Sequence, residues 1–138
     1  MKIKFIEKEN LSIILPFLGL LNENTDKEIL ELRLEEMKNN SYYCVGVFDN
    51  EKLIGICGFW LLVKYYVGKH IEPDNVVILP EYRNQNIGNK MMEFVYEYAK
   101  NNGCIASELN CYVANNSGIK FWLNQGYKIL GFHFQKKL

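Results

Sequence analysis

The segment with the clearest chemical potential is the polar turn PEYRNQNIGNK, residues 80–90, which separates an apolar run from a helix-like run. The first turn of a helix leaves backbone N–H groups unpaired, and together with the helix dipole these groups favour an anion. Arg83 and Lys90 flank the turn and add positive charge. Gly88 allows the backbone to approach a phosphate closely and reaches positive φ freely, and Asn86 tolerates positive φ better than most residues. The turn therefore predicts a phosphate or pyrophosphate site.

Two common nucleotide motifs do not fit this turn. No Gly-Lys-Ser/Thr sequence follows it, which excludes a P-loop. The glycine spacing differs from a dinucleotide-binding fingerprint, and repeated strand–helix–strand units do not surround it. An ordinary helix N-terminus is the alternative explanation of the turn taken alone.

The elements that must position this turn follow from hydrophobic periodicity and turn residues. Strand-like runs alternate with helix-like runs only in the second half of the chain, which predicts a mixed sheet, antiparallel early and parallel later. Pro16 kinks or restarts the first helical stretch, and Thr25 with Glu28 forms a capping box for the second. Gly55 and Gly58 indicate a bulge or a close backbone approach. We predict strands over 2–9, 41–48, 52–67, 70–80, 107–113 and 127–137, and helices over 11–21, 25–40, 88–103 and 115–126.

Composition restricts the class of protein. The 138 residues indicate a single domain, residues 1–138, and balanced charge, 16 Lys+Arg against 16 Asp+Glu, argues against a nucleic-acid binder. The longest apolar run stops at Lys64, too short to cross a membrane, and the N-terminus does not resemble a signal peptide. Cys44, Cys57, Cys104 and Cys111 lack the spacing of a metal site. We expect a cytoplasmic protein with free thiols, no bound metal, and no nucleic-acid or membrane partner.

Two motifs together resemble the GNAT superfamily of N-acetyltransferases. Residues 80–92 are similar to its acyl-CoA-binding motif, (Q/R)-x-x-G-x-(G/A), with Arg83 first, Asn86 in the first glycine place and Gly88 last. Residues 115–132, NNSGIKFWLNQGYKILGF, resemble a later motif in which an Asn precedes a short aromatic helix and a Gly-aromatic pair. The order of elements over the whole chain matches as well. The resemblance implies an α/β (α+β) fold with a mixed, mostly antiparallel twisted sheet, splayed central strands and about four flanking helices.

The resemblance also implies a co-substrate, acetyl-CoA, and the residues that hold it. The pyrophosphate would lie on the turn, and the pantetheine would run along the central strand as an added strand does. One strand N–H would polarise the thioester carbonyl. The residues carried over are Val77, Ile78, Leu79, Arg83, Asn84, Gln85, Asn86, Ile87, Gly88, Asn89, Lys90 and Asn115.

Three departures from the family pattern bear on function. Asn86 replaces a glycine, which would loosen or reshape the phosphate loop. Trp122 stands where the family often has a Tyr that protonates the leaving thiolate, and an indole N–H is not such an acid; Tyr112 is a substitute, with surface packing as the alternative. Residues 127–138 leave little room for the family's usual last strand, so we expect that the sheet edge is short or is completed by a second copy in a homodimer.

The acceptor amine must lose a proton before it attacks, because an aliphatic amine has a pKa of about 10.4. His70, Glu72 and Asp74 alternate on the strand that leads into the turn, and a period of two places them on one face unless Pro73 introduces a bulge. We predict Glu72 or Asp74 as the catalytic base, Glu72 first, while a solvated surface role is the alternative for each. His70 is structural or faces the substrate. Four aromatic residues line an acceptor pocket or belong to the core: Phe59, Trp60, Tyr65 and Tyr66.

These observations predict an N-acetyltransferase that transfers an acetyl group from acetyl-CoA to a primary amine of a small molecule or a peptide N-terminus. A binding module that holds acyl-CoA without turnover is the alternative, and Asn86 and Trp122 favour it. Transfer to a protein or a tRNA is a third reading, which the neutral charge disfavours for tRNA.

Overall fold

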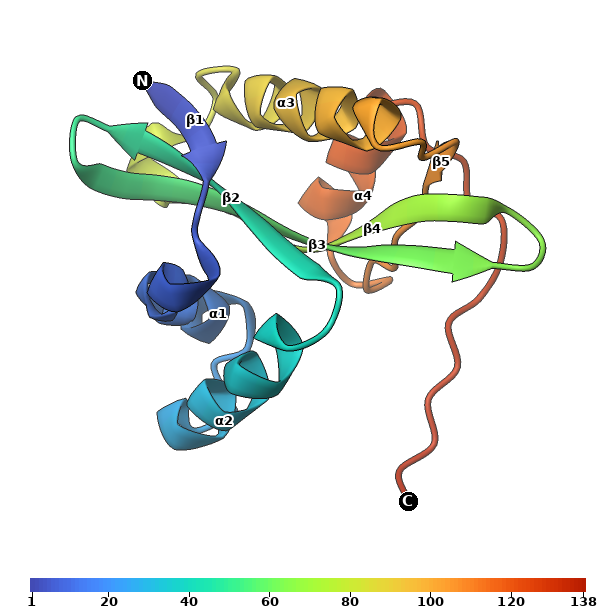
Figure 1. Ribbon diagram of the computed structural model, residues 1–138, viewed down its shortest axis with the longest axis horizontal. Helices are drawn as coiled ribbons and strands as arrows, with labels where there is room; N and C mark the ends of the chain where they lie inside the picture. The colour runs from blue at the N-terminus through green and yellow to red at the C-terminus, as the bar shows by residue number, and fades with distance from the viewer.

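The computed structural model describes all residues, Met1–Leu138, as one sheet with helices on both faces (Figure 1). The sheet has five strands in the order β1-β2-β3-β4-β5; β1 to β4 pair antiparallel and β4 with β5 parallel. The strands are β1 Lys2–Phe5, β2 Tyr42–Asp49, β3 Lys52–Lys64, β4 Gly68–Ile78 and β5 Ala106–Ser107. The helices are η1 Lys8–Ile14, α1 Leu15–Leu21, α2 Lys27–Lys38, η2 Pro80–Tyr82, α3 Ile87–Asn101 and α4 Asn116–Asn124. The predicted α+β fold with a mixed, mostly antiparallel sheet is confirmed.

Two hydrophobic cores lie on opposite faces of the sheet. On one face α3 buries Met91, Met92 and Val95 against strand residues such as Val45 and Phe59. On the other face η1, α1 and α2 pack their apolar side chains against β2, β3 and β4, and Figure 1 shows these helices on the side opposite α3 and α4. The sheet is therefore held from both sides along β1 to β4.

A bulge interrupts β4 near its middle, as Pro73 and the strand glycines indicated. Gly58 pairs with Asn75 and the next residue of β3, Phe59, pairs with Pro73, which leaves Asp74 without a partner. A side chain at Gly58 would overlap the Tyr42 hydroxyl, which donates to Asn75 Oδ1 at 2.8 Å. The close approach that glycine permits thus fixes the residue beside the bulge.

The parallel pair β4–β5 is short and then separates. Only His70 with Ala106 and Ile71 with Ser107 pair in register, and the Glu108 N–H adds one bond to the Ile71 carbonyl at 2.9 Å. The prediction of a strand over 107–113 is wrong beyond Ser107, and that of a strand over 127–137 is wrong as well. Both segments lack a neighbouring strand, and a strand requires a hydrogen-bonded partner.

The observed N-termini of α1, α2 and α4 test three predictions about helix starts. Pro16 lies in the first turn of α1, where its missing N–H costs nothing, so the restart at Pro16 is confirmed. The capping box is wrong, because Asp26 is the N-cap of α2 and makes no side-chain cap. Asn115 caps α4 by accepting from the Gly118 N–H at 3.0 Å, as predicted.

The four cysteines are free thiols in the structure, and three of them are buried. Burial raises the pKa of Cys44 to about 12, so this thiol remains protonated at neutral pH. None of the helices combines the length and the apolar character that crossing a bilayer requires.

Candidate active site

The loop between β4 and α3 presents a row of unpaired backbone donors. Asn84 and Asn86 adopt left-handed conformations with φ of 60° and 63°. The six N–H groups of residues 84–89 have no acceptor within the protein, and the first helical bond of α3 runs from Lys90 N–H to the Asn86 carbonyl at 3.3 Å. Successive free N–H groups around left-handed residues form a concave anion-binding nest. The donors are those expected for a pyrophosphate: Asn84, Gln85, Asn86, Ile87, Gly88 and Asn89.

The side chain of Asn86 does not cap the helix it precedes. An N-cap Asn ordinarily accepts from the N–H two or three residues later, which would consume donors of the nest. Here Asn86 Oδ1 accepts from Asn89 Nδ2 at 2.6 Å instead. The Asn at the family's glycine place therefore leaves the backbone donors free while it ties the loop to α3.

This contact continues as a chain of hydrogen bonds toward the sheet. Gln125, which follows α4, donates from Nε2 to Asn89 Oδ1 at 2.5 Å and accepts from the Tyr96 hydroxyl at 3.2 Å. The Tyr96 hydroxyl also lies 3.2 Å from the Tyr127 hydroxyl, which in turn lies 2.6 Å from Ser107 Oγ on β5. The chain links the phosphate loop to α4 and to the point where β4 and β5 separate.

We expect that Asn89→Ala weakens acetyl-CoA binding three- to tenfold, because loss of the Asn86 contact lets the loop leave its nest conformation. That factor corresponds to about one hydrogen bond, roughly 0.5–1.5 kcal/mol. Asn86→Gly should lose a similar factor, although glycine adopts the same φ at less steric cost. Isothermal titration of acetyl-CoA against the single variants and the double variant measures the coupling. Additive losses would show that the two side chains act independently and would contradict the expectation.

The outer edge of β4 offers backbone groups beside this loop. The Leu79 N–H donates to the Ile54 carbonyl at 2.9 Å, so it is not available as the predicted strand donor. The N–H groups of successive residues in an antiparallel ladder point to opposite sides of the strand. The N–H of Val77 therefore points toward β3, and the N–H of Ile78 lies on the edge away from β3. Arg83 Nε donates to the Ile78 carbonyl at 3.0 Å and so places its guanidinium at this edge. Of the three residues predicted to supply strand backbone, Ile78 is the one with a free N–H.

A cleft opens where β4 and β5 separate. Its volume is about 220 Å³, and it contains both carboxylates predicted as bases. The residues that line it are Trp60, Glu72, Pro73, Asp74, Leu109 and Asn110. Of the aromatics considered for an acceptor pocket, Trp60 lines this cleft, whereas Tyr65 and Tyr66 are exposed and do not line it. The other strand aromatic nearby, Phe59, is part of the core.

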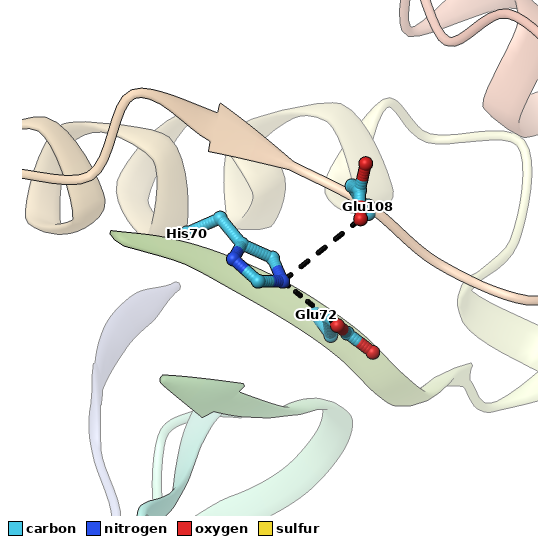
Figure 2. A group of neighbouring side chains, drawn as sticks. All are labelled: His70, Glu72 and Glu108. Carbon is cyan, nitrogen blue, oxygen red and sulfur yellow. Dashed lines mark hydrogen bonds and ion pairs between the residues drawn. The ribbon is translucent and has the colours of Figure 1, made fainter. Parts of the chain in front are cut away.

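Glu72 is held by two donors at one wall of this cleft, and Figure 2 shows one of them, His70, whose ring nitrogen faces both Glu72 and Glu108. Its Oε2 lies 2.8 Å from Lys64 Nζ and 2.8 Å from Nε2 of the buried His70. Glu108 follows β5, and its Oε1 lies 3.9 Å from the same nitrogen of His70. The same Glu108 oxygen accepts a hydrogen bond from the Tyr66 hydroxyl at 2.5 Å. Partial burial pushes the pKa of Glu72 upward, but the hydrogen bonds and charges of Lys64 and His70 outweigh it, so the net pKa is lowered.

The partners of His70 determine where its ring carries hydrogen. Nδ1 lies 2.9 Å from the Gly68 carbonyl, which can only accept, so Nδ1 donates. Nε2 can then bond Glu72 only if it too carries a hydrogen, or if Glu72 is protonated. The ring is therefore held between the Gly68 carbonyl and the Glu72 carboxyl group, and this contact orients Glu72.

The ligand atoms of His70, Glu72 and Glu108 lie within 4.8 Å of one another, a spacing that a metal ion could use. However, the Lys64 ammonium already forms an ion pair with Glu72, and the Tyr66 hydroxyl already donates a hydrogen bond to Glu108. Because a cation would have to displace or face this ammonium, we interpret the cluster as an ion-pair network and assign it no metal.

Asp74 has fewer hydrogen-bond partners than Glu72 and is more exposed to solvent. It lies at the unpaired position of the β4 bulge and is exposed to solvent. Its single hydrogen-bond partner is Trp60, whose indole Nε1 donates to Oδ2 at 2.9 Å. The other oxygen, Oδ1, has no partner. The bulge thus separates Asp74 from the His70–Glu72 pair while both carboxylates still line the cleft.

The remaining predicted residues lie around the loop and α4. Lys90 and Arg83 are exposed at the nest, where their charge reaches an anion. Asn115 is exposed and uses Oδ1 for the α4 cap, which leaves its amide nitrogen free. Trp122 packs edge-on against Phe121 and Tyr127 at 4.9 and 5.3 Å between ring centroids.

Sequence reasoning did not identify Lys64, Glu108, Gln125 or the side-chain role of Asn89. Glu108 reaches His70 only through the parallel pairing of β4 with β5, and Gln125 reaches Asn89 only through packing of α4 on α3. The register of β4 against β5 was the one signal that could have brought Glu108 beside His70.

With this geometry in place, the family is established by comparison. Residues 12–127 match the model of the acetyltransferase (GNAT) family, and the chain belongs to this family. The resemblance read from residues 80–92 and 115–132 is confirmed.

Two curated relatives share shorter stretches. The chain is 33% identical over 67 residues to an aminoalkylphosphonate N-acetyltransferase of Salmonella typhimurium, a match that covers 49% of this chain and 44% of that protein. It is 27% identical over 86 residues to a thialysine N-epsilon-acetyltransferase of Mus musculus, covering 62% and 48%. The chain thus spans about half the length of these curated relatives.

Solved structures share the fold over the whole chain. An aminoglycoside N-acetyltransferase in complex with CoA superposes with a TM-score of 0.84 at 15% identity, covering 99% of this chain and 93% of that one. A ribosomal-protein-alanine N-acetyltransferase from Brucella melitensis biovar Abortus 2308 gives a TM-score of 0.82 at 13% identity, with 100% of both chains covered. At these identities the likeness shows the fold.

Proposed function

We propose that the protein is an N-acetyltransferase that transfers an acetyl group from acetyl-CoA to a primary amine of a small molecule or a peptide N-terminus. The observation that carries the proposal is the nest of six free N–H groups at residues 84–89, adjoining the open edge of β4 that leads to a cleft with two carboxylates. The pyrophosphate would bind the nest beside Arg83 and Lys90. The named activities of the two curated relatives, both N-acetyltransferases, support the reaction type.

The reaction balances with the groups present. An ammonium acceptor loses a proton to a carboxylate in the cleft, directly or through one water, and its nitrogen attacks the thioester carbonyl carbon. The Ile78 N–H would stabilise the oxyanion that develops. The N–C bond forms, the C–S bond breaks, and CoA leaves as a thiolate, tolerable for a thiol whose ordinary pKa is about 8.5. Trp122 therefore need not supply a proton.

We propose Asp74 as the base and Glu72 as its neighbour in acceptor binding, which reverses the order inferred from the sequence. Glu72 is bound by the Lys64 ammonium and by His70, and its pKa is lowered, so it accepts a proton poorly. Asp74 has an oxygen without a partner and lies in the same cleft. The two carboxylates together favour a positively charged acceptor.

We infer a homodimer that forms through a sheet edge, because β5 pairs with β4 over two residues only. We also propose a cytoplasmic location, which the four free thiols support.

An assay of free thiol release tests the function against the alternative of an acyl-CoA-binding module without turnover. The protein is incubated with acetyl-CoA and a panel of amines, and the products are identified by mass spectrometry. We expect thiol release with at least one class of cationic primary amine. Tight acetyl-CoA binding by calorimetry with no release over the whole panel would support the binding module instead. Absence of both binding and release would overturn both.

A further inference from the structure

Tyr42 is a buried residue whose hydroxyl finds its partner two strands away. The tyrosine lies on β2 and has no solvent exposure, yet its hydroxyl donates to Asn75 Oδ1 on β4 at 2.8 Å. The strand β3 lies between β2 and β4 (Figure 1). The side chain of Tyr42 crosses β3 at Gly58, where a Cβ would overlap the hydroxyl. A glycine in the middle strand therefore allows one β2 side chain to contact β4.

The hydroxyl makes this contact beside the bulge of β4. Asn75 pairs with Gly58, and the next ladder pair of β4 lies at Pro73, so Asp74 between them has no partner on β3. A bulge is the point at which the regular hydrogen bonds of a strand are interrupted. The ladder therefore does not fix Asp74 itself. Its orientation depends on the residues that flank it and on the contacts of its own side chain.

The ring of Tyr42 contacts the other group that holds Asp74. Tyr42 and Trp60 are opposite each other in the register of β2 and β3, and their ring centroids lie 5.1 Å apart with an interplanar angle of 58°. Trp60 Nε1 donates to Asp74 Oδ2 at 2.9 Å. One tyrosine thus contacts both supports of the carboxylate. Its hydroxyl holds the next residue of β4, and its ring packs against the indole that bonds the carboxylate.

We propose that Tyr42 is a positioning residue that holds the Asp74 carboxylate in the orientation needed to take a proton from the acceptor amine. This inference rests on the proposed function, in which Asp74 is the base. Because Tyr42 is fully buried, it acts through Asn75 and Trp60 and not by touching the acceptor. A general base must lie within about 2.6–3.2 Å of the atom that gives up the proton, or reach it through one water, so a carboxylate on an unpaired residue needs such support.

The Tyr42 hydroxyl does not itself supply or take a proton in the reaction. Burial raises the pKa of Tyr42 well above its ordinary value, so the hydroxyl stays a neutral donor over the pH range in which acetylation is measured. A change in the pH profile on removing this hydroxyl therefore reports on the base that it positions.

A double-mutant cycle tests the proposal. Tyr42→Phe keeps the ring against Trp60 and removes only the hydroxyl. We expect kcat for amine acetylation to fall roughly 10- to 100-fold, as for a misplaced catalytic group, while the acceptor KM and the acetyl-CoA Kd change little. The deficit should shrink at high pH, as for Asp74→Asn. In the Asp74→Asn background the same substitution should cost almost nothing, because no base is left to position.

Two further variants serve as a second test and a matched control. Asn75→Ala removes the acceptor of the same hydrogen bond and should give the same deficit in kcat, and it decides the matter if Tyr42→Phe does not fold. Tyr82→Phe removes a tyrosine hydrogen bond of 3.1 Å to Asp49, at the other end of β2. It should lower the melting temperature without the pH-dependent loss of kcat.

Independent losses would overturn the proposal. If Tyr42→Phe lowers kcat by the same factor with and without the Asp74 carboxylate, or lowers only the melting temperature, its role is structural. Either result leaves the proposed function standing, since the unmodified chain still releases thiol with an amine. If Asp74→Asn leaves turnover unchanged, the base assignment and the role of Tyr42 fail together while acetyl transfer stands. No thiol release by the unmodified chain with any amine would overturn the proposed function as well.

Discussion

Asp74→Asn is expected to lower kcat/KM for amine acetylation by about 10²–10⁴-fold, the usual contribution of a general base. The amide keeps the size of the carboxylate and can still accept from the Trp60 indole, but it cannot take the proton of an acceptor ammonium. Acetyl-CoA affinity should change little, because Asp74 lies in the cleft and not in the phosphate nest. Steady-state kinetics with the amine found in the panel, together with calorimetry, separates the two effects.

The pH dependence gives this expectation a second readout. As pH rises toward the amine pKa of about 10.4, more acceptor arrives neutral and the base is needed less. The deficit of Asp74→Asn should therefore shrink at high pH. Trp60→Phe, which removes the hydrogen bond to Asp74 Oδ2 and leaves the carboxylate, should cost much less than Asp74→Asn.

Glu72→Gln is the matched control, and its main effect should be on stability. The folded pKa of Glu72 is lowered, so its stabilising contribution is present above the ordinary glutamate pKa of about 4.3 and is lost as pH falls through the folded value. The difference in melting temperature between Glu72→Gln and the unmodified chain should thus be visible at pH 7 and vanish in acid. If Glu72→Gln instead shows the large, pH-dependent loss of kcat/KM and Asp74→Asn does not, Glu72 is the base.

The sequence predicted what depends on near neighbours in the chain. The phosphate nest and the Asn115 cap each form within about ten residues and contain turn-forming residues, and Pro73 indicated the β4 bulge. The assignment of a base needed more than the spacing of His70, Glu72 and Asp74. Whether Glu72 is free depends on Lys64, which is brought to it by the β3–β4 hairpin.

Strand predictions failed where pairing, and not propensity, decides the structure. Residues 108–113 and 128–137 have the composition of strands, but a strand exists only when a neighbour accepts its hydrogen bonds. In one copy neither has such a neighbour, because β5 diverges from β4 after Ser107 and the last segment leaves the sheet. The periodicity of the last segment remains informative, since it predicts a surface that must be covered.

Gly88→Val is expected to weaken acetyl-CoA binding tenfold or more, and the structure changes the reason given by the sequence. The sequence suggested that Gly88 lets backbone approach the phosphate or supplies a positive φ, which predicts lost binding in an otherwise intact fold; the positive φ of this loop lies at Asn84 and Asn86 and not at Gly88. A Cβ at Gly88 would instead lie 3.1 Å from Phe121 Cε1 of α4. Valine should therefore push α4 from α3 and strain the Gln125–Asn89 contact that holds the nest, with overpacking costing about 1–3 kcal/mol of stability.

A compensating substitution distinguishes these two causes. Phe121→Leu creates room for the valine methyl groups without touching the phosphate side of the loop. The double variant Gly88→Val with Phe121→Leu should recover most of the melting temperature and most of the acetyl-CoA affinity, while Phe121→Leu alone should bind almost normally. Recovery of stability without recovery of affinity would show that the glycine serves the phosphate directly. Recovery of both would show that the packing of α4 against α3 limits which residues fit at position 88. The affinity of the nest for acetyl-CoA would then depend on helix packing as much as on its own backbone donors.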